Sequence, residues 1–310
     1  MMKFAFLFPG QGSQSIGMMQ GYADVAVVRD TFTEAADILG QDLWFMVSDG
    51  PVELLNATVN TQPLMLTAGV ATYRAWLAQG GRAPDVMAGH SLGEYTALVA
   101  AGALSFADAL PLVRTRALAM QDAVAEGVGA MAAILGLDDD TVRAVCAEAA
   151  QGEVLEAVNF NSPGQVVIAG NKAAVERGMV LAKEKGAKRA LPLPVSVPSH
   201  CALMRPAAEK LSAALANMQI TAPQVPVLHN ADVISYQQAD QIRDALARQL
   251  YSPVRWVETV QAMANDDVTL AAECGPGKVL AGLTKRIDDR VAATALTSVA
   301  ALTEFNNLIA

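Results

Sequence analysis

Short runs of apolar residues alternate along the chain with longer segments in which apolar positions recur at helical spacing. The first run, residues 4–8, stops at Pro9-Gly10 and predicts a buried strand that leads into a loop. Three later runs of the same character predict further buried strands, at 84–88, 225–228 and 270–273. Strands that alternate with helices are typical of an α/β domain built on a parallel sheet core.

The segments between these runs have helical character. One helix is expected to start at Thr61-Gln62-Pro63, because proline is favoured in a first turn, and to end before Gly80-Gly81. Three other helices are predicted, at about 24–39, 94–101 and 106–125.

The pattern changes at Gly127 and Gly129, after which the predicted elements follow one another closely. Their order is strand, helix, strand, strand, helix, strand, at 130–135, 138–150, 153–158, 165–169, 173–185 and 190–195. This βαββαβ order matches a ferredoxin-like unit. We therefore expect a small inserted domain at 127–194, and a larger α/β domain formed by 1–126 and 195–310.

The composition excludes several classes of protein. Hydrophobic residues make up 53% of the 310 residues and charged residues 17%, which is typical of a globular protein with a large core and not of a disordered chain. The formal net charge is -9, and a chain this acidic is a poor general ligand for nucleic acid or for a membrane surface. We expect neither as a partner.

The cysteines and the N-terminus point to the cytoplasm. The three cysteines, Cys146, Cys201 and Cys274, have no spacing typical of a disulfide framework or a zinc site, so we expect reduced thiols and no metal. The apolar run after Lys3 is too short for a signal peptide, and no apolar stretch approaches the roughly 20 residues of a membrane span.

The strongest chemical signal is Gly89-His90-Ser91-Leu92-Gly93, which fits the G-x-S-x-G pattern of a nucleophile elbow. A serine on a sharp turn between a strand and a helix needs small residues two positions before and after it, and both are glycines. The alternative is a capping box, in which Ser91 and Glu94 merely start the helix. The flanking glycines and the preceding strand favour the elbow.

A serine nucleophile needs a base, and the chain has three histidines: His90, His200 and His229. His90 is adjacent to Ser91, and neighbouring side chains in a sharp turn point apart. Between His200, after the predicted insert, and His229, after the apolar run 225–228, spacing gives His200 only a modest lead. A histidine at either place is usually a structural residue whose ring nitrogens are hydrogen-bonded.

Two other segments can contribute to such a site. The loop from Pro9 to Gln14 lacks the pattern of a phosphate loop, but its glycines would let a backbone N–H approach an oxyanion, beside the N–H of Leu92. An ordinary tight turn explains the loop equally well. Arg114 and Arg116 flank an apolar helical stripe on opposite sides, so one could enter a pocket while the other stays in water, and periodicity does not say which.

Together these segments resemble the malonyl-CoA:acyl carrier protein transacylase family. The matching motifs are FLFPGQGSQ at 6–14, TQPLM at 61–65, GHSLGEY at 89–95, RTRALAM at 114–120, PVSVPSHCALM at 194–204, QLYSPVRW at 249–256 and GPGKVL at 275–280. They extend over essentially the whole chain, and their combination is far more specific than G-x-S-x-G alone.

The resemblance implies an α/β-hydrolase-like large domain with a ferredoxin-like insert. It implies Ser91 as the nucleophile, His200 as its base, and the backbone carbonyl of Gln249 as the group that orients the histidine. The remaining implied roles concern the substrate: the backbone N–H groups of Gln11 and Leu92 form the oxyanion hole, Arg116 binds the substrate carboxylate, and Gln62 lines the pocket.

The implied reaction transfers a malonyl group from malonyl-CoA to the phosphopantetheine thiol of acyl carrier protein, through a malonyl-serine and without a cofactor. Rival interpretations are the malonyltransferase of a malonate decarboxylase, a polyketide acyltransferase, a serine esterase or thioesterase, and a binding module in which Ser91 is only a cap. An acidic carrier must meet a local basic patch on this acidic chain. The candidate cations are Lys188, Arg189, Arg205, Lys278, Lys285 and Arg286.

Overall fold

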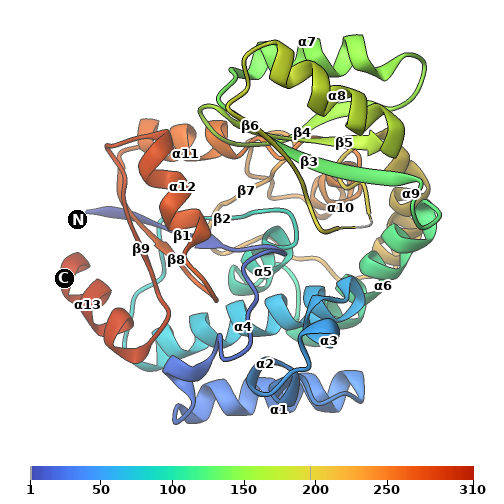
Figure 1. The fold of residues 1–310 in the computed structure, drawn as a ribbon. Helices are drawn as coiled ribbons and strands as arrows, with labels where there is room; N and C mark the ends of the chain where they lie inside the picture. The colour runs from blue at the N-terminus through green and yellow to red at the C-terminus, as the bar shows by residue number, and fades with distance from the viewer. Residues whose placement is uncertain (1, 196) are drawn as a thin grey trace.

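The computed structural model describes residues 2–195 and 197–310, and its strands form two separate sheets (Figure 1). Met1 and Ser196, which fall within the predicted large domain, lie outside the described residues. The larger sheet has five parallel strands in the order β7-β2-β1-β8-β9, and the smaller has four antiparallel strands in the order β4-β5-β3-β6. The chain is thus an α/β protein with a parallel sheet and a second, antiparallel sheet.

The parallel sheet takes its strands from the two ends of the chain. These strands are β1 (Lys3–Phe8), β2 (Val86–Gly89), β7 (Val227–Leu228), β8 (Val268–Glu273) and β9 (Ala292–Ala295). The predicted strands at 4–8, 84–88, 225–228 and 270–273 correspond to the first four. Parallel pairing places the carboxyl ends of β1 and β2, and with them Pro9 and His90, at the same edge of the sheet.

Both faces of the parallel sheet are covered, because successive side chains of β1 point to opposite sides. Phe4, Phe6 and Phe8 pack into the main core, where Phe4 and Phe6 meet Trp76 and Phe305 edge-on or tilted. Ala5 and Leu7 enter a second core on the opposite face. Runs that are apolar throughout are therefore required on these strands.

The helices that build the main core are α1 (Ala26–Leu39), α2 (Leu43–Ser48), α3 (Val52–Asn56), α4 (Thr58–Ala78), α5 (Gly93–Ala100), α6 (Phe106–Ala123), α9 (Arg205–Ala216), α10 (Ala239–Gln249) and α13 (Val299–Ile309), with short 3₁₀ turns at Gln20–Tyr22 and Ala202–Met204. The second core is closed by α11 (Trp256–Asn265) and α12 (Val279–Ile287). No helix of the described ranges is long and apolar enough to cross a bilayer.

The antiparallel sheet comes from one continuous stretch of chain. Its elements in chain order are β3 (Gly129–Leu135), α7 (Asp139–Ala150), β4 (Leu155–Ser162), β5 (Gln165–Asn171), α8 (Lys172–Glu184) and β6 (Arg189–Pro192). The helices α7 and α8 cover the face of this sheet that is turned away from the parallel sheet (Figure 1), and they enclose a core of their own. The predicted order of two helices and four strands is confirmed.

Three predicted boundaries are wrong. Strand β6 ends at Pro192 and not at 195, because the N–H of Val195 bonds back to the carbonyl of Leu193 instead of to β3. Helix α4 begins at Thr58 and not at Thr61, because the carbonyl of Ala57 already accepts from the N–H groups of Asn60 and Thr61 before Pro63 is reached. Strand β4 extends to Ser162 instead of ending at 158. Its last part is mostly polar, with Asn159, Asn161 and Ser162 around Phe160, so the hydrophobic pattern weakens while the backbone pairing with β5 continues.

Candidate active site

Ser91 lies on a sharp turn between β2 and α5, with φ at 51° in the left-handed region. For a residue other than glycine this backbone conformation costs about 1–3 kcal/mol in free energy. The turn is possible only because its neighbours are glycines: a Cβ on Gly89 would come within 1.8 Å of the carbonyl carbon of Gly93, and a Cβ on Gly93 within 2.0 Å of the carbonyl oxygen of Phe8. The elbow geometry expected from the sequence is therefore present.

The capping-box alternative for Ser91 is wrong. Helix α5 has Leu92 as its N-cap, and no side chain caps it. The hydroxyl of Ser91 instead lies 2.8 Å from Nε2 of His200. The carboxyl group of Glu94 is buried behind the turn and bonds to other groups.

His200 is held in the orientation that a base for Ser91 needs. Its Nδ1 lies 2.8 Å from the backbone carbonyl oxygen of Gln249, so Nδ1 carries the proton and donates to it. Nε2 is then unprotonated and accepts from the Ser91 hydroxyl. The third group of this arrangement is a backbone carbonyl and not a carboxylate.

The environment keeps His200 neutral. Burial and the positive charge of Arg116 lower its pKa from the ordinary 6.5 to about 3. A neutral imidazole is the form that can take a proton from serine.

A flat pH profile is expected from this shift. Since the pKa of His200 lies at about 3, kcat/KM for acylation of Ser91 should not fall between about pH 8 and about pH 5. The free energy of unfolding should behave differently: the unfolded histidine binds a proton below its ordinary pKa of 6.5, so stability falls as the pH drops from there towards 3. Stopped-flow acylation and urea unfolding across this range measure the two effects. A loss of kcat/KM with a midpoint near the ordinary histidine pKa would contradict the assignment.

The other two histidines do not contact the Ser91 hydroxyl. Nδ1 of His229 lies 2.7 Å from a carboxyl oxygen of Glu94, and its ring packs against Tyr236. Nε2 of His90 lies 2.8 Å from Oδ1 of Asn161, and burial lowers the pKa of His90. Spacing left His200 and His229 open, and in the structure the ring of His200 is the one that contacts the Ser91 hydroxyl.

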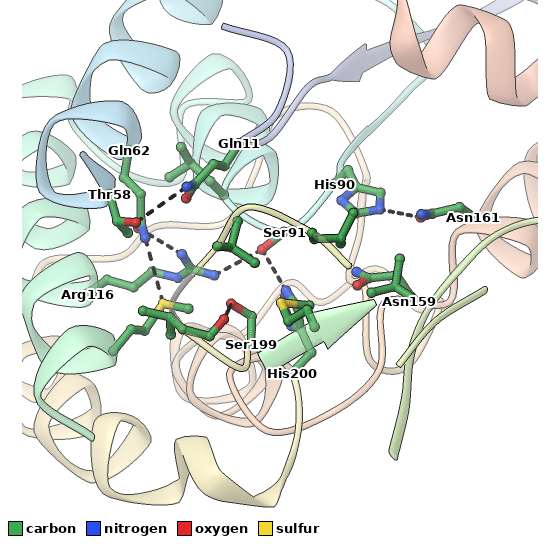
Figure 2. A pocket seen from close by; sticks show the side chains of 17 residues that line it. Gln11, Thr58, Gln62, His90, Ser91, Arg116, Asn159, Asn161, Ser199 and His200 are labelled. Carbon is green, nitrogen blue, oxygen red and sulfur yellow. Dashed lines mark hydrogen bonds between the residues drawn. The ribbon is translucent and has the colours of Figure 1, made fainter. Parts of the chain in front are cut away.

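Arg116 reaches the same cavity, whereas Arg114 does not. The Arg116 side chain is 1% exposed and donates from Nη1 to Oε1 of Gln62 at 2.8 Å. Its Nη2 donates to Oγ of Ser91 at 3.2 Å (Figure 2). The same nitrogen donates to Oε1 of Gln249 at 3.0 Å. Arg114 points to the opposite side and bonds to the carbonyl oxygen of Leu39 and the side chain of Gln41.

Arg116 carries a buried positive charge, and its hydrogen-bond partners within the described residues are the neutral side chains of Gln62, Gln249 and Ser91. Burial lowers its pKa, and the proximity of Tyr95 and Glu94 offsets part of this effect. The Tyr95 ring lies 5.4 Å from the guanidinium carbon. A buried cation of this kind favours an anionic ligand, and a planar guanidinium matches the two oxygens of a carboxylate.

The groups surround one cavity of about 200 Å³ (Figure 2). Its wall includes Ser91, His200 and Arg116, together with Gln62 from α4. It also includes Asn159 and Asn161 from β4, so the cavity lies between the antiparallel sheet and the carboxyl edge of the parallel sheet.

Gln11 and Leu92, the expected oxyanion-hole residues, both line this cavity. Neither backbone N–H has an acceptor among residues 2–195 and 197–310. The side chain of Gln11 is tied to Thr58 by a hydrogen bond of 3.4 Å. Two unpaired N–H groups beside a serine hydroxyl can bind a developing oxyanion.

Sequence reasoning missed four polar residues at or behind the site: Glu94, Asn159, Asn161 and Asn230. The two β4 asparagines were predicted to follow a strand, although their alternation could have marked one face of it. Asn230 follows His229 with no motif to single it out. Glu94 was noticed only as a possible cap. The described residues hold no group of three or more histidine, cysteine or acidic side chains arranged to bind a metal ion.

Comparisons with known proteins agree with this geometry. Residues 5–280 match the acyl transferase domain family. The malonyl CoA-acyl carrier protein transacylase of Escherichia coli K12 is 58% identical over 303 residues, which cover 97% of this chain and 98% of that protein.

Solved structures show the same relationship. The acyl-carrier-protein S-malonyltransferase of Burkholderia pseudomallei 1710b is 61% identical, with a TM-score of 0.97 over 99% of this chain and 100% of that one. A malonyl-transacylase solved in complex with its type II PKS acyl-carrier protein is 53% identical, with a TM-score of 0.97 over 99% of both chains. The chain therefore belongs to the malonyl CoA-acyl carrier protein transacylase family.

Proposed function

We propose that this protein transfers a malonyl group from malonyl-CoA to the phosphopantetheine thiol of acyl carrier protein, and that Ser91 carries the group between the two thiols. The observation that carries the proposal is the single cavity in which Ser91 contacts both His200 and Arg116. A base and a buried cation at one serine match an acyl donor that ends in a carboxylate. The names of the relatives support the same substrates.

The first half-reaction forms the acyl-enzyme. His200 Nε2 takes the hydroxyl proton while Oγ of Ser91 bonds to the thioester carbon, and the N–H groups of Gln11 and Leu92 stabilise the oxyanion. The C–S bond then breaks, and the proton on His200 passes to the sulfur of CoA. Arg116 holds the distal carboxylate of the malonyl group throughout.

The second half-reaction reverses these steps with another thiol. The pantetheine thiol of the carrier gives its proton to His200 and attacks the malonyl-serine ester. Ser91 regains its proton as the ester bond breaks. Every step uses side chains and backbone groups of this chain, so we propose that no cofactor takes part. The absence of a long apolar helix in the described ranges is compatible with work in the cytoplasm, which we propose as its location.

We also propose that the chain forms two domains. The larger is an α/β-hydrolase-like domain at 1–126 and 195–310, and the smaller a ferredoxin-like domain at 127–194. The support is the origin of the strands: those of the antiparallel sheet all lie between Gly129 and Pro192, and those of the parallel sheet lie outside this range. The βαββαβ chain order and the β4-β5-β3-β6 strand order support the ferredoxin-like assignment of the smaller domain.

The direct test is the intact mass of the protein after mixing with malonyl-CoA and then with phosphopantetheinylated carrier protein. We expect a malonyl adduct that disappears as malonyl-carrier forms. Release of free malonate faster than transfer would indicate a thioesterase instead. No adduct at all would contradict a serine carrier.

Arg116→Ala should reverse the preference for a carboxylated acyl group. The variant leaves the malonyl carboxylate unpaired in a buried pocket, which should cost about 2–5 kcal/mol in transition-state binding. Acetyl-CoA has no carboxylate and should lose little. The measurement is the ratio of kcat/KM for malonyl-CoA and acetyl-CoA.

Arg114→Ala is the matched control, because Arg114 lies two residues away on α6 and points out of the cavity. Its substitution should leave the ratio unchanged, even if the stability falls. A ratio that collapses in Arg114→Ala and survives in Arg116→Ala would contradict the proposed carboxylate site.

The six cations expected to meet the carrier are all exposed and form no ion pair within the described ranges. One of them, Lys278, lies near the cavity. It is the N-cap of α12, and its neighbour Gly277 packs against Ser13 in the loop that carries Gln11. This puts Lys278 beside a loop that lines the cavity.

Lys278→Glu should therefore raise KM for the carrier by about threefold or more at low ionic strength, and the effect should shrink as salt rises. Acylation by malonyl-CoA should change much less. Lys183→Glu is the control, because this exposed lysine lies on α8, on the outer face of the antiparallel sheet. Equal effects of the two substitutions would exclude a docking role for Lys278.

A further inference from the structure

The carboxyl group of Glu94 lies fully buried behind the nucleophile turn, three residues after Ser91. Burying a carboxyl group is costly unless its oxygens accept hydrogen bonds. Both oxygens do: one lies 2.7 Å from Nδ1 of His229. The other accepts from the backbone N–H of Asn230 at 2.8 Å and from Nε2 of Gln249 at 3.0 Å.

Two of these partners hold the backbone of Ser91 itself. The N–H of Ser91 donates to Oδ1 of Asn230 at 2.7 Å, and its carbonyl oxygen accepts from Nε2 of Gln249 at 2.9 Å. Asn230 also donates from Nδ2 to the carbonyl oxygen of Gly89 at 2.7 Å. Both polar groups of the strained residue are thus held by the side chains of Asn230 and Gln249. One oxygen of Glu94 holds these two residues in turn, Asn230 by its backbone N–H and Gln249 by its side-chain amide.

Gln249 also contacts the two other side chains of the site, Arg116 and His200. Its Oε1 accepts from Arg116 at 3.0 Å, and its backbone carbonyl accepts from His200 at 2.8 Å. A shift of the Gln249 side chain would move Arg116 and Ser91 relative to each other. A change at Glu94 therefore reaches the reacting groups without touching them.

We propose that Glu94 is a positioning residue, which acts through Asn230 and Gln249 to hold Ser91 in its left-handed conformation, facing His200 and Arg116. This inference rests on the proposed role of Ser91 as the acyl carrier. It assigns to the glutamate of the GHSLGEY segment a function that differs from a helix cap. Because Asn230 and Gln249 share one carboxyl oxygen, that oxygen is the part of Glu94 that matters for the site.

The shared oxygen makes two substitutions differ sharply. In Glu94→Gln the amide oxygen can still accept from Asn230 and Gln249, while the NH₂ group faces His229, whose Nδ1 accepts in the other tautomer. Acylation of Ser91 should then fall by no more than about tenfold, the effect of one weakened hydrogen bond. Glu94→Leu removes every acceptor, and acylation should fall by about 100-fold, as for a nucleophile displaced by about 1 Å.

Glu273 offers a matched control. It is equally buried and its carboxyl group accepts from the N–H of Ala281 at the start of α12, but it does not line the cavity or contact the residues around Ser91. Glu273→Gln and Glu273→Leu should change the unfolding temperature. The reactivity of Ser91 per folded molecule should be the same in these two variants. All four variants are compared by thermal unfolding and by pre-steady-state kinetics.

Two reagents report the reactivity of Ser91: malonyl-CoA, followed by intact mass, and a general organophosphorus serine reagent. The second reagent needs an aligned serine and histidine but no malonyl pocket. If the natural protein reacts with the organophosphorus reagent and not with malonyl-CoA, the proposed function fails, while the ranking of the Glu94 variants still tests the positioning role.

Asn230→Ala provides a second route, since it removes the acceptor for the Ser91 N–H and leaves Glu94 in place. We expect a loss comparable to that of Glu94→Leu, and a combined variant that loses much less than the product of the two. If Glu94→Leu does not fold, Asn230→Ala and Glu94→Gln carry the test. Full reactivity of folded Glu94→Leu or of Asn230→Ala, or losses that multiply, would overturn the proposal.

Discussion

Ser91→Ala should fold normally and form no acyl-enzyme, with transfer reduced by about 10⁴-fold or more. The physical reason is that, in the proposed mechanism, the hydroxyl is the protein group that bonds to the acyl carbon, so nothing replaces it. Removing the oxygen leaves the turn intact, because the backbone N–H and carbonyl of residue 91 keep their bonds to Asn230 and Gln249. Intact mass after mixing with malonyl-CoA, together with thermal unfolding, gives both results.

Ser199→Ala is the appropriate comparison. Ser199 lines the same cavity, and its hydroxyl makes only a long contact of 3.5 Å to the carbonyl oxygen of Val197. This variant should still be acylated. A malonyl adduct that persists in Ser91→Ala and vanishes in Ser199→Ala would show that Ser199 carries the acyl group, and it would contradict our proposal.

His200→Ala should slow acylation of Ser91 by about 10²- to 10⁴-fold, the usual contribution of a positioned acid and base. The hydroxyl would lose its acceptor at 2.8 Å, and no other histidine ring contacts it within the described part of the chain. Single-turnover acylation measured by rapid quench is the suitable assay. The loss should appear in both half-reactions, because the same imidazole serves each.

His229→Ala separates a base from a buried structural histidine. This substitution leaves one oxygen of Glu94 without its partner and opens a cavity, so we expect a lower unfolding temperature. The oxygen that holds Asn230 and Gln249 is the other one. Acylation per folded molecule should therefore fall far less than in His200→Ala, and the opposite ranking would refute the choice of base.

Local sequence patterns predicted most of the elements because apolar runs and helical periodicity reflect burial directly. The strands around 4–8 and 165–169 and the helix from Phe106 were close to their observed positions. The errors arose where backbone hydrogen bonds set the end of an element at a position that the local sequence pattern did not mark. The N-terminus of α4 is set by the carbonyl of Ala57, upstream of the proline that was expected to mark it. The end of β4 is set by pairing with β5, which the polar residues of its last part conceal.

Local sequence patterns predicted part of the candidate site. G-x-S-x-G identified the turn of Ser91, because the close approach of Gly89 and Gly93 excludes side chains at those two positions. Nothing local distinguished Arg116 from Arg114, and spacing gave His200 only a modest lead over His229. Those choices came from the resemblance to a family, and they concern residues that only a folded chain brings to the serine.

The amino-acid sequence alone was enough to predict the alternation of strands and helices, the position of the elbow and the family resemblance, because each depends on neighbouring residues or on the order of short motifs along the chain. The tertiary structure decided which polar groups meet. Ser91 contacts His200, which lies 109 residues away in the sequence, and Gln249, which lies 158 residues away. These contacts depend on strand pairing and helix packing. It also decided that the carboxyl group of Glu94 bonds to Asn230 and Gln249 and does not cap its own helix, since a buried carboxyl group takes the donors that the fold brings within reach.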